Sequence, residues 1–467
     1  MDASEEETKN QMLAIHGPTS IENRIKVLDE RLSGYIPPRE TWTPADEALR
    51  IPIDLYRVPI DEARAMQLRA LKHAFSHHYK LSDFYSKYCE MRGITPDDIK
   101  TYDDLEKIPL IPDLTFKSRL SGEDFAHWIA NIYTGEPPTV VIESANPTFD
   151  DVLNAYNAAG MVVLYSSGTS GVPTVIPMSM RTHLARQYMD AKLKVTMFDY
   201  LAADHTLLLF PRFTDTNLGI GRAFEFHPKL FSDVKYAMDF KISADLSLKA
   251  MTDAEPERAP SSAEDRQRKI IDITIKWLER YERTADVVRL EGGPFMFLQI
   301  MDTLEQEGKH FEFGERGMLN TGGGWKVSED KRVSGTEFRK RIEEMLGIPE
   351  TRCTDTYALS EMTGIMNTCP EGHYFHLPYT WLKPLVLDKS FMPADYGERG
   401  RFAFLDSMNY SFPGFVITGD EVRMLEHCPV CDRLGPVLES EIKRAPSVEL
   451  RGCAEEVRTV LQQDFSE

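Results

Sequence analysis

Short apolar runs that end in glycine- or proline-rich turns are the feature that most constrains the fold of this chain. Three such runs lie at residues 161–165, 206–210 and 286–290. Helical stretches separate them, and the clearest spans 262–283, where Ile271, Ile275 and Leu278 recur on one face. Apolar strands that alternate with amphipathic helices indicate an α/β domain.

The charge of the chain narrows the function classes. Among its 467 residues, 74 Asp and Glu outnumber 54 Lys and Arg, which gives a net charge of -20. Because DNA and RNA repel an acidic surface, we expect no nucleic-acid partner. The longest apolar runs are far shorter than the ~20 residues of a membrane-spanning helix. The acidic N-terminus lacks the features of a signal peptide, so we expect a cytoplasmic protein whose six cysteines are not disulfide-paired.

A loop rich in glycine and hydroxyl groups follows the first apolar run. Residues 165–174 read Tyr-Ser-Ser-Gly-Thr-Ser-Gly-Val-Pro-Thr. Backbone N–H groups and hydroxyls in such a loop can surround a phosphate, and glycine permits close approach of the backbone. No Gly-Lys-Ser/Thr follows, so this is not a Walker loop. By itself the loop is also compatible with a simple turn.

Three further motifs follow in order: 320–326 (Asn-Thr-Gly-Gly-Gly-Trp-Lys), 355–361 (Asp-Thr-Tyr-Ala-Leu-Ser-Glu) and 418–420 (Thr-Gly-Asp). With the loop, they resemble the motifs of the adenylate-forming superfamily of acyl and aryl ligases. The loop resembles its phosphate loop, residues 357–361 its Tyr-Gly-x-Thr-Glu motif, and residues 418–420 its Thr-Gly-Asp motif. This resemblance implies the large N-terminal α/β domain of that superfamily, with ATP and Mg²⁺ as cofactors.

The resemblance also implies roles for individual residues. Those that would hold the phosphates are Ser166, Ser167, Gly168, Thr169, Ser170 and Gly171. Those that would surround the adenine are Gly322, Gly323, Gly324 and Tyr357, and Ser360 is a further nucleotide-binding candidate. Glu361 would hold Mg²⁺ through its carboxylate oxygens, and Asp420 would accept hydrogen bonds from the ribose. Many members carry lysine where this chain has Thr174, and Lys326 is the candidate for the missing catalytic charge.

A narrower resemblance points to the branch that contains phenylacetate–CoA ligases and the acyl-protein synthetases (LuxE type) of bacterial luminescence. It covers roughly residues 65–455, and its segments are 73–79, 93–99, 400–406, 411–415 and 450–453. It implies a fatty acid substrate, although an aromatic acid stays open, and an acyl reductase protein as partner.

The C-terminal part of the sequence bears on the acyl acceptor. A coenzyme A ligase of this superfamily ordinarily has a C-terminal lid domain with a catalytic lysine, and only 47 residues follow Asp420. We therefore expect a truncated or absent lid. Cys453 is the candidate catalytic thiol, because a thiolate can attack an acyl adenylate; an inert cysteine is the alternative. The predicted units are an N-terminal helical extension (1–60), the adenylate-forming domain (61–425) and a short tail (426–467).

Two cysteine pairs have the spacing of metal ligands. Cys369 and His373 form a Cys-x3-His pair, and Cys428 and Cys431 form a Cys-x2-Cys pair. Together they predict a tetrahedral structural Zn²⁺ site that holds the C-terminal tail, since four protein ligands leave no open position. Unrelated thiols are the alternative. His376 is interpreted as a substrate-side group or as an ordinary strand residue.

These observations predict an acid–thiol ligase. It would activate a carboxylic acid, by preference a fatty acid, as acyl-AMP, transfer the acyl group to Cys453, and pass it to a reductase. Two alternatives stay open. The chain could be a ligase that passes the acyl group to coenzyme A or another external acceptor, or a non-catalytic nucleotide-binding scaffold.

Overall fold

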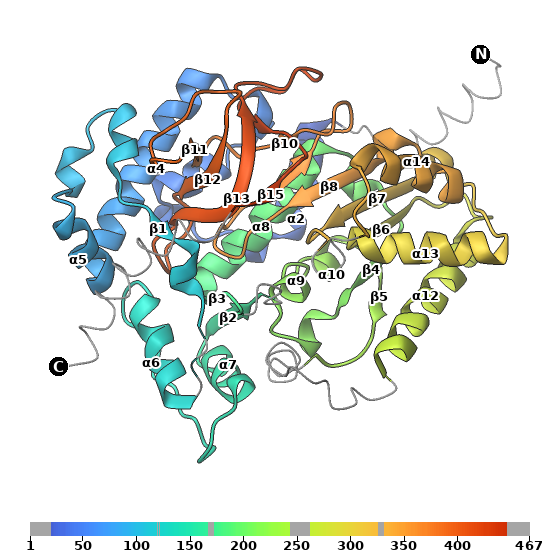
Figure 1. Ribbon diagram of the computed structural model, residues 1–467, viewed down its shortest axis with the longest axis horizontal. Coiled ribbons are helices and arrows are strands. Elements are labelled where there is room, and N and C mark those ends of the chain that lie inside the picture. Colours follow the sequence, from blue (N-terminus) through green and yellow to red (C-terminus); the bar gives the residue numbers. More distant parts are fainter. Residues whose placement is uncertain are drawn as a thin grey trace.

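A large mixed sheet forms the centre of the molecule (Figure 1). The computed structural model describes residues 20–118, 120, 122–166, 172–242, 262–325 and 331–445. Within these ranges, thirteen strands share the sheet. One half is parallel and the other is mainly antiparallel.

The parallel half follows from apolar runs separated by amphipathic helices. In spatial order its strands are β5 (Asp233–Met238), β4 (His205–Pro211), β6 (Val288–Gly292), β7 (Gly317–Gly322) and β8 (Cys353–Tyr357). The apolar runs at 206–210 and 286–290 correspond to β4 and β6.

Helices cover both faces of this half. On one face, α12 (Ser262–Tyr281), α13 (Pro294–Glu307) and α14 (Gly335–Leu346) pack side by side (Figure 1). They share an apolar core with strand residues such as Leu319. On the other face lies α8 (Met180–Met197), whose Lys194 contacts Asn320. Successive side chains of β7 therefore point to opposite faces, as the pleat of a strand requires.

The other half of the sheet continues from β8. Its strands are β9 (Met366–Thr368), β10 (Phe375–His376), β14 (Val437–Leu438), β13 (Phe415–Leu425), β12 (Arg399–Asp406) and β11 (Leu382–Leu387). Two short strands also pair with β13: β1 (Ile111–Pro112), which is parallel, and β15 (Lys443–Arg444), which is antiparallel. The register sets Pro112 opposite Ile417 and Arg444 opposite Asp420. The segment 418–420 thus receives neighbours from distant parts of the chain.

A separate hairpin carries the two ends of the predicted phosphate loop. Its strands are β2 (Met161–Tyr165) and β3 (Val175–Ser179), and Tyr165 lies opposite Val175. The first apolar run is therefore a strand, but its partner is β3 rather than the main sheet. Tyr165 also forms a parallel bridge with Leu218, which follows β4, so the hairpin is held next to the parallel half.

Helices of the N-terminal part pack around this core. They are α2 (Ile21–Arg31), α3 (Pro44–Leu49), α4 (Ile60–Leu81), α5 (Asp83–Met91), α6 (Gly122–Ile132) and α7 (Phe149–Ala158). Helix α2 contacts α8, and the buried residues of α4 include Leu71, Ala74 and Phe75. Among the described residues, no helix combines the length and apolar character needed to cross a bilayer.

This mixed α/β architecture confirms the predicted fold class. The limits of the three predicted units and the reduced C-terminal lid stay predictions.

Candidate functional site

The predicted adenine-binding residues lie at the carboxyl ends of adjacent strands. Gly322 ends β7 and Tyr357 ends β8, and these two strands pair directly. Gly323 and Gly324 have φ of 82° and 65°, a left-handed backbone that glycine adopts without strain. The chain can therefore turn sharply after β7. In open α/β sheets, ligands bind at this edge, outside the carboxyl ends of the strands.

Tyr357 and Asp420 come together at this edge although they are far apart in sequence. The Tyr357 hydroxyl donates to Asp420 Oδ2 at 2.6 Å, and Arg444 Nη1 lies 2.9 Å from Oδ1. The Asp420 N–H donates to Thr418 Oγ1 where the register of β13 against β12 is irregular. Burial raises the pKa of Asp420, while Arg444 and Tyr357 act against that shift. Two of the predicted motifs thus form one polar cluster.

Glu361 lies four residues beyond the end of β8 and is only 7% exposed. Burial and the nearby Asp113 raise the pKa of Glu361 to about 7, and a hydrogen bond from Thr174 partly opposes them. Thr174 is the last residue of the predicted phosphate loop. The structure therefore brings the predicted Mg²⁺ ligand next to that loop. A buried carboxylate with a second carboxylate nearby suits a divalent cation.

Both ends of the phosphate loop are closed by hydrogen bonds. The Ser166 N–H donates to the Thr174 carbonyl at 2.8 Å, and the Thr174 N–H donates to Ser166 Oγ at 2.9 Å. Ser360 is half-buried, and its carbonyl accepts from Arg186 Nη1. Several predicted site residues lie outside the described part of the chain: Ser167, Gly168, Thr169, Ser170, Gly171, Lys326 and Cys453.

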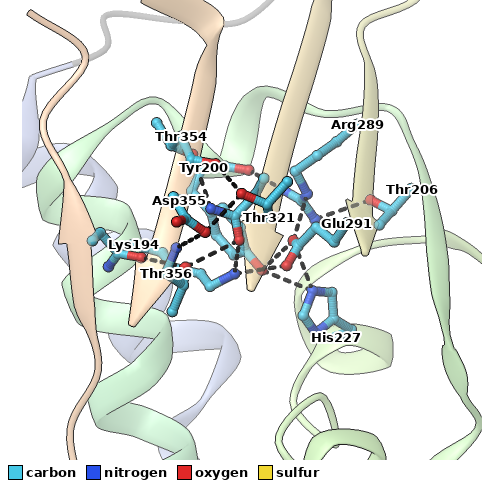
Figure 2. Close-up of polar contacts among 12 residues, drawn as sticks. Lys194, Tyr200, Thr206, His227, Arg289, Glu291, Thr321, Thr354, Asp355 and Thr356 are labelled. Carbon is cyan, nitrogen blue, oxygen red and sulfur yellow. Dashed lines mark hydrogen bonds and ion pairs between the residues drawn. The ribbon is translucent and has the colours of Figure 1, made fainter. Parts of the chain in front are cut away.

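A buried polar network supports these strand ends from the α8 side (Figure 2). Lys194 Nζ donates to Glu291 Oε2 at 2.6 Å and to Asn320 Oδ1 at 3.1 Å, and the Thr356 hydroxyl donates to the same Asn320 oxygen. Burial would raise the pKa of Glu291, but Lys194 and His227 hold it well below its usual range. The network links the ends of β6, β7 and β8.

Sequence reasoning missed this network. Its signal was available in β6, where Arg289 and Glu291 interrupt an apolar run. Both side chains are buried, with 0% and 1% exposure, so they face the interior rather than solvent. Asp113 was also missed. It follows β1 and only the pairing of β1 with β13 brings it near Glu361 and Asp420.

The three cysteines of the predicted metal site lie together, with a different histidine beside them. The ligand atoms of four side chains lie within 4.8 Å of one another: Cys369, His376, Cys428 and Cys431. His373 is not in this cluster, because its Nε2 lies 3.3 Å from a Glu350 carboxylate oxygen. His376 replaces it because β10 pairs with both β9 and β14, which carries this histidine to the cysteines. The three predicted cysteines therefore lie together, and the prediction of His373 as the fourth ligand is wrong.

The donor set fits a zinc ion. Cys369 and Cys428 sulfurs are 3.9 Å apart, and Cys431 Sγ is 3.3 Å from His376 Nε2. Zn–S bonds of about 2.3 Å in a tetrahedron separate two sulfurs by roughly 3.8 Å. Hydrogen bonds with Cys369 and His376 also lower the pKa of the Cys431 thiol, which favours the thiolate form that metals bind.

Comparisons with known proteins agree with these motifs. The family model described as "Acyl-protein synthetase, LuxE" matches residues 259–464. The long-chain-fatty-acid–luciferin-component ligase of Vibrio harveyi is 24% identical over 405 residues, which cover 85% of this chain and 88% of the relative. The ligase of the same name from Aliivibrio fischeri is 22% identical over 422 residues, or 87% of this chain and 92% of the relative.

Solved structures show the same fold. One is 2-hydroxyisobutyryl-CoA ligase in the postadenylation state with 2-HIB-AMP, which is 16% identical with a TM-score of 0.57 over 89% of this chain and 74% of that chain. The same ligase in the thioesterification state has a TM-score of 0.56 at 16% identity, over 88% and 72%.

Together these findings confirm the resemblance to the adenylate-forming superfamily and to its acyl-protein synthetases. The names of the relatives agree with the predicted enzyme class, an acid–thiol ligase.

Proposed function

We propose that this protein activates a carboxylic acid with ATP and transfers the acyl group to a thiol. The observation that carries the proposal is the convergence of Tyr357, Asp420, Glu361 and Thr174 at one edge of the sheet. These residues come from three separate motifs, and a nucleotide site gives all of them a use. ATP would lie with its adenine against Gly322 and Tyr357 and its ribose on Asp420.

The first step would join the acid to AMP. A carboxylate oxygen of the acid attacks the α-phosphorus, the bond to the β-phosphate oxygen breaks, and pyrophosphate leaves. Ser166, Thr174 and Glu361 are described residues that this proposal places around the phosphates, and Glu361 would hold Mg²⁺. The ion, when bound, neutralises charge on the triphosphate. The protein contributes mainly positioning and electrostatic stabilisation.

The second step would form a thioester. The Cys453 thiolate attacks the carbonyl carbon of acyl-AMP, and AMP leaves as its bond to that carbon breaks. A reductase protein would then take the acyl group. The printed names of the two curated relatives support a long-chain fatty acid as substrate. Cys453 lies outside the described residues, so its support comes from the sequence.

We also propose that Cys369, His376, Cys428 and Cys431 hold a structural zinc ion. Four protein ligands leave no open coordination position, which excludes a catalytic role for the ion. The site would join β9, β10 and the segment after β13. These strands flank Tyr357 and Asp420, so the ion would stabilise the frame of the nucleotide site.

Intact-protein mass spectrometry tests the proposed function. Wild type and Cys453→Ser are incubated with ATP, Mg²⁺ and a panel of carboxylic acids that vary in chain length and aromaticity. A hydroxylamine-sensitive acyl adduct on wild type alone supports the proposal and identifies the acid. Acid-dependent pyrophosphate release without an adduct indicates an external acceptor such as coenzyme A. Nucleotide binding with neither signal indicates a non-catalytic scaffold, the reading that the uncharged Thr174 favours.

A further inference from the structure

Asp113 is a buried carboxylate with an unsatisfied oxygen. It is 7% exposed, and its Oδ1 is buried without a hydrogen-bond partner among the described residues. Its Oδ2 lies 3.3 Å from Lys117 Nζ. Burying a carboxylate oxygen without a partner is unfavourable, so such an atom in a folded protein calls for an explanation.

The Asp113 carboxylate lies close to the residues of the proposed nucleotide site. A Cβ atom built on Gly419 would lie 3.5 Å from Asp113 Oδ2, so this carboxylate packs against residues 418–420 of β13. Asp113 also acts electrostatically on both Glu361 and Asp420. It therefore lies near the predicted Mg²⁺ ligand as well as the predicted ribose ligand. Neighbouring carboxylates repel one another, and a divalent cation beside them offsets that repulsion.

Lys117, the ion-pair partner of Asp113, lies beside the predicted phosphate loop. It forms an antiparallel bridge with Thr174, so its backbone lies directly opposite the last residue of the phosphate loop. Its side chain is 18% exposed and is held by Asp113. Thr174 itself carries no charge. A cationic residue therefore lies opposite the described end of the loop.

We propose that Asp113 is a second carboxylate ligand, beside Glu361, for the divalent cation that accompanies the nucleotide, and that Lys117 contacts the nucleotide phosphates from opposite Thr174. This inference rests on the proposed function. Carboxylate oxygens are the ligands that Mg²⁺ and Mn²⁺ accept, and a bound cation satisfies the free Oδ1. The cation would also weaken the hold of Asp113 on Lys117, which frees the ammonium group for phosphate.

Direct binding measurements on the full chain test both assignments. Mn²⁺ binding in the presence of ATP is followed by electron paramagnetic resonance, and ATP binding in the presence of EDTA by calorimetry. Asp113→Asn is expected to weaken Mn²⁺ binding about tenfold or more, since a charged ligand contact is lost, and to leave metal-free ATP binding unchanged or tighter. Lys117→Met is expected to weaken metal-free ATP binding by about tenfold or more.

Matched controls come from the preceding segment. Asp103 and Lys107 are exposed, and Lys107 forms a comparable local ion pair with Asp104 at 2.6 Å. Asp103→Asn and Lys107→Met are expected to bind both ligands like wild type. Adding Thr174→Lys to Lys117→Met returns a cation to the other side of the bridge and is expected to restore ATP binding. Asp113→Glu keeps the carboxylate and is expected to retain Mn²⁺ binding better than Asp113→Asn.

Several results would overturn the inference. Mn²⁺ binding by Asp113→Asn equal to that of Asp103→Asn removes the metal assignment. Unchanged ATP binding by Lys117→Met, or no rescue by Thr174→Lys, removes the phosphate assignment. If Asp113→Asn does not fold, Mn²⁺ binding by Asp113→Glu relative to wild type still tests the metal assignment. ATP binding by the Lys117 variants still tests the phosphate assignment. An acid-dependent pyrophosphate exchange assay on wild type distinguishes failure of the proposed function from failure of this inference. If wild type shows no exchange, the proposed function is contradicted, while the Mn²⁺ and ATP binding results still test Asp113 and Lys117.

Discussion

The hydroxyl of Tyr357 donates a 2.6 Å hydrogen bond to Oδ2 of Asp420, which joins the last residue of β8 to the middle of β13. Three strands, β9, β10 and β14, lie between β8 and β13 in the order of the sheet, so the bond joins two strands that are not neighbours. Asp420 is further held by Arg444 from β15. The adenine and ribose ligands of the proposed site are therefore coupled before any nucleotide binds.

Removing this bond tests the coupling. Tyr357→Phe keeps the ring for stacking but loses the hydroxyl, so ATP affinity is expected to fall by a factor of about 2–10, the value of one hydrogen bond. Tyr357→Ala also loses the ring and is expected to bind more weakly still. Calorimetric titration with ATP measures both. Tyr396→Phe, which alters a 50% exposed tyrosine, is the control, and an equal effect there would contradict the assignment.

The corrected metal site predicts a clear difference between two nearby histidines. His376→Ala is expected to lower the zinc content from one ion per chain to a small fraction, because it removes one of four ligands. His373→Ala is expected to retain the ion, because His373 faces Glu350 instead. Mass spectrometric metal analysis after gel filtration gives the zinc content. Retention of zinc by His376→Ala and loss by His373→Ala would restore the ligand set expected from spacing alone.

The buried pair Lys194–Glu291 predicts a large stability effect. Lys194→Met removes the charged hydrogen bond to Glu291 Oε2, while Arg289 Nε stays 3.0 Å from Oε1, and is expected to lower the free energy of unfolding by about 1.5–3 kcal/mol. The exposed pair Lys340–Glu344 is the comparison, and Lys340→Met is expected to change stability by less than about 1 kcal/mol. Urea unfolding followed by circular dichroism measures both. A small effect of Lys194→Met would mean that the network contributes little to the fold.

Asp190 on α8 predicts a pH dependence of stability. Burial raises the pKa of Asp190 to about 7, and Arg186 and Lys194 only partly oppose this shift. The folded state then binds more protons than the unfolded state between the unfolded pKa, about 4, and pH 7. The contribution of Asp190 to stability therefore falls as the pH rises through this window.

Asp190→Asn removes that titration. The melting temperature of the variant, relative to wild type, is expected to rise between pH 5 and pH 8. Differential scanning fluorimetry across this range measures the difference, with the exposed Asp97→Asn as control. A difference between Asp190→Asn and wild type that does not vary with pH would show that Asp190 keeps the same charge throughout.

The sequence by itself determined the fold class and the motifs assigned to the proposed nucleotide site. The apolar runs that end at 165, 210 and 290 lie in the buried strands β2, β4 and β6, because short apolar runs followed by glycine or proline turns favour strands over helices. The glycines after β7 and the Thr-Gly-Asp motif in β13 are short contiguous segments, so they are visible in the chain without its partners. Cys-x2-Cys spacing is local for the same reason.

Pairing between distant strands decided the rest, and local patterns do not encode it. The choice of His376 over His373 depends on β10 lying between β9 and β14. The approach of Asp113 to Glu361 depends on β1 pairing with β13. The partner of Lys194 depends on which strand faces α8. Each of these contacts is set by the register of elements far apart in the chain, and packing of the whole core selects that register.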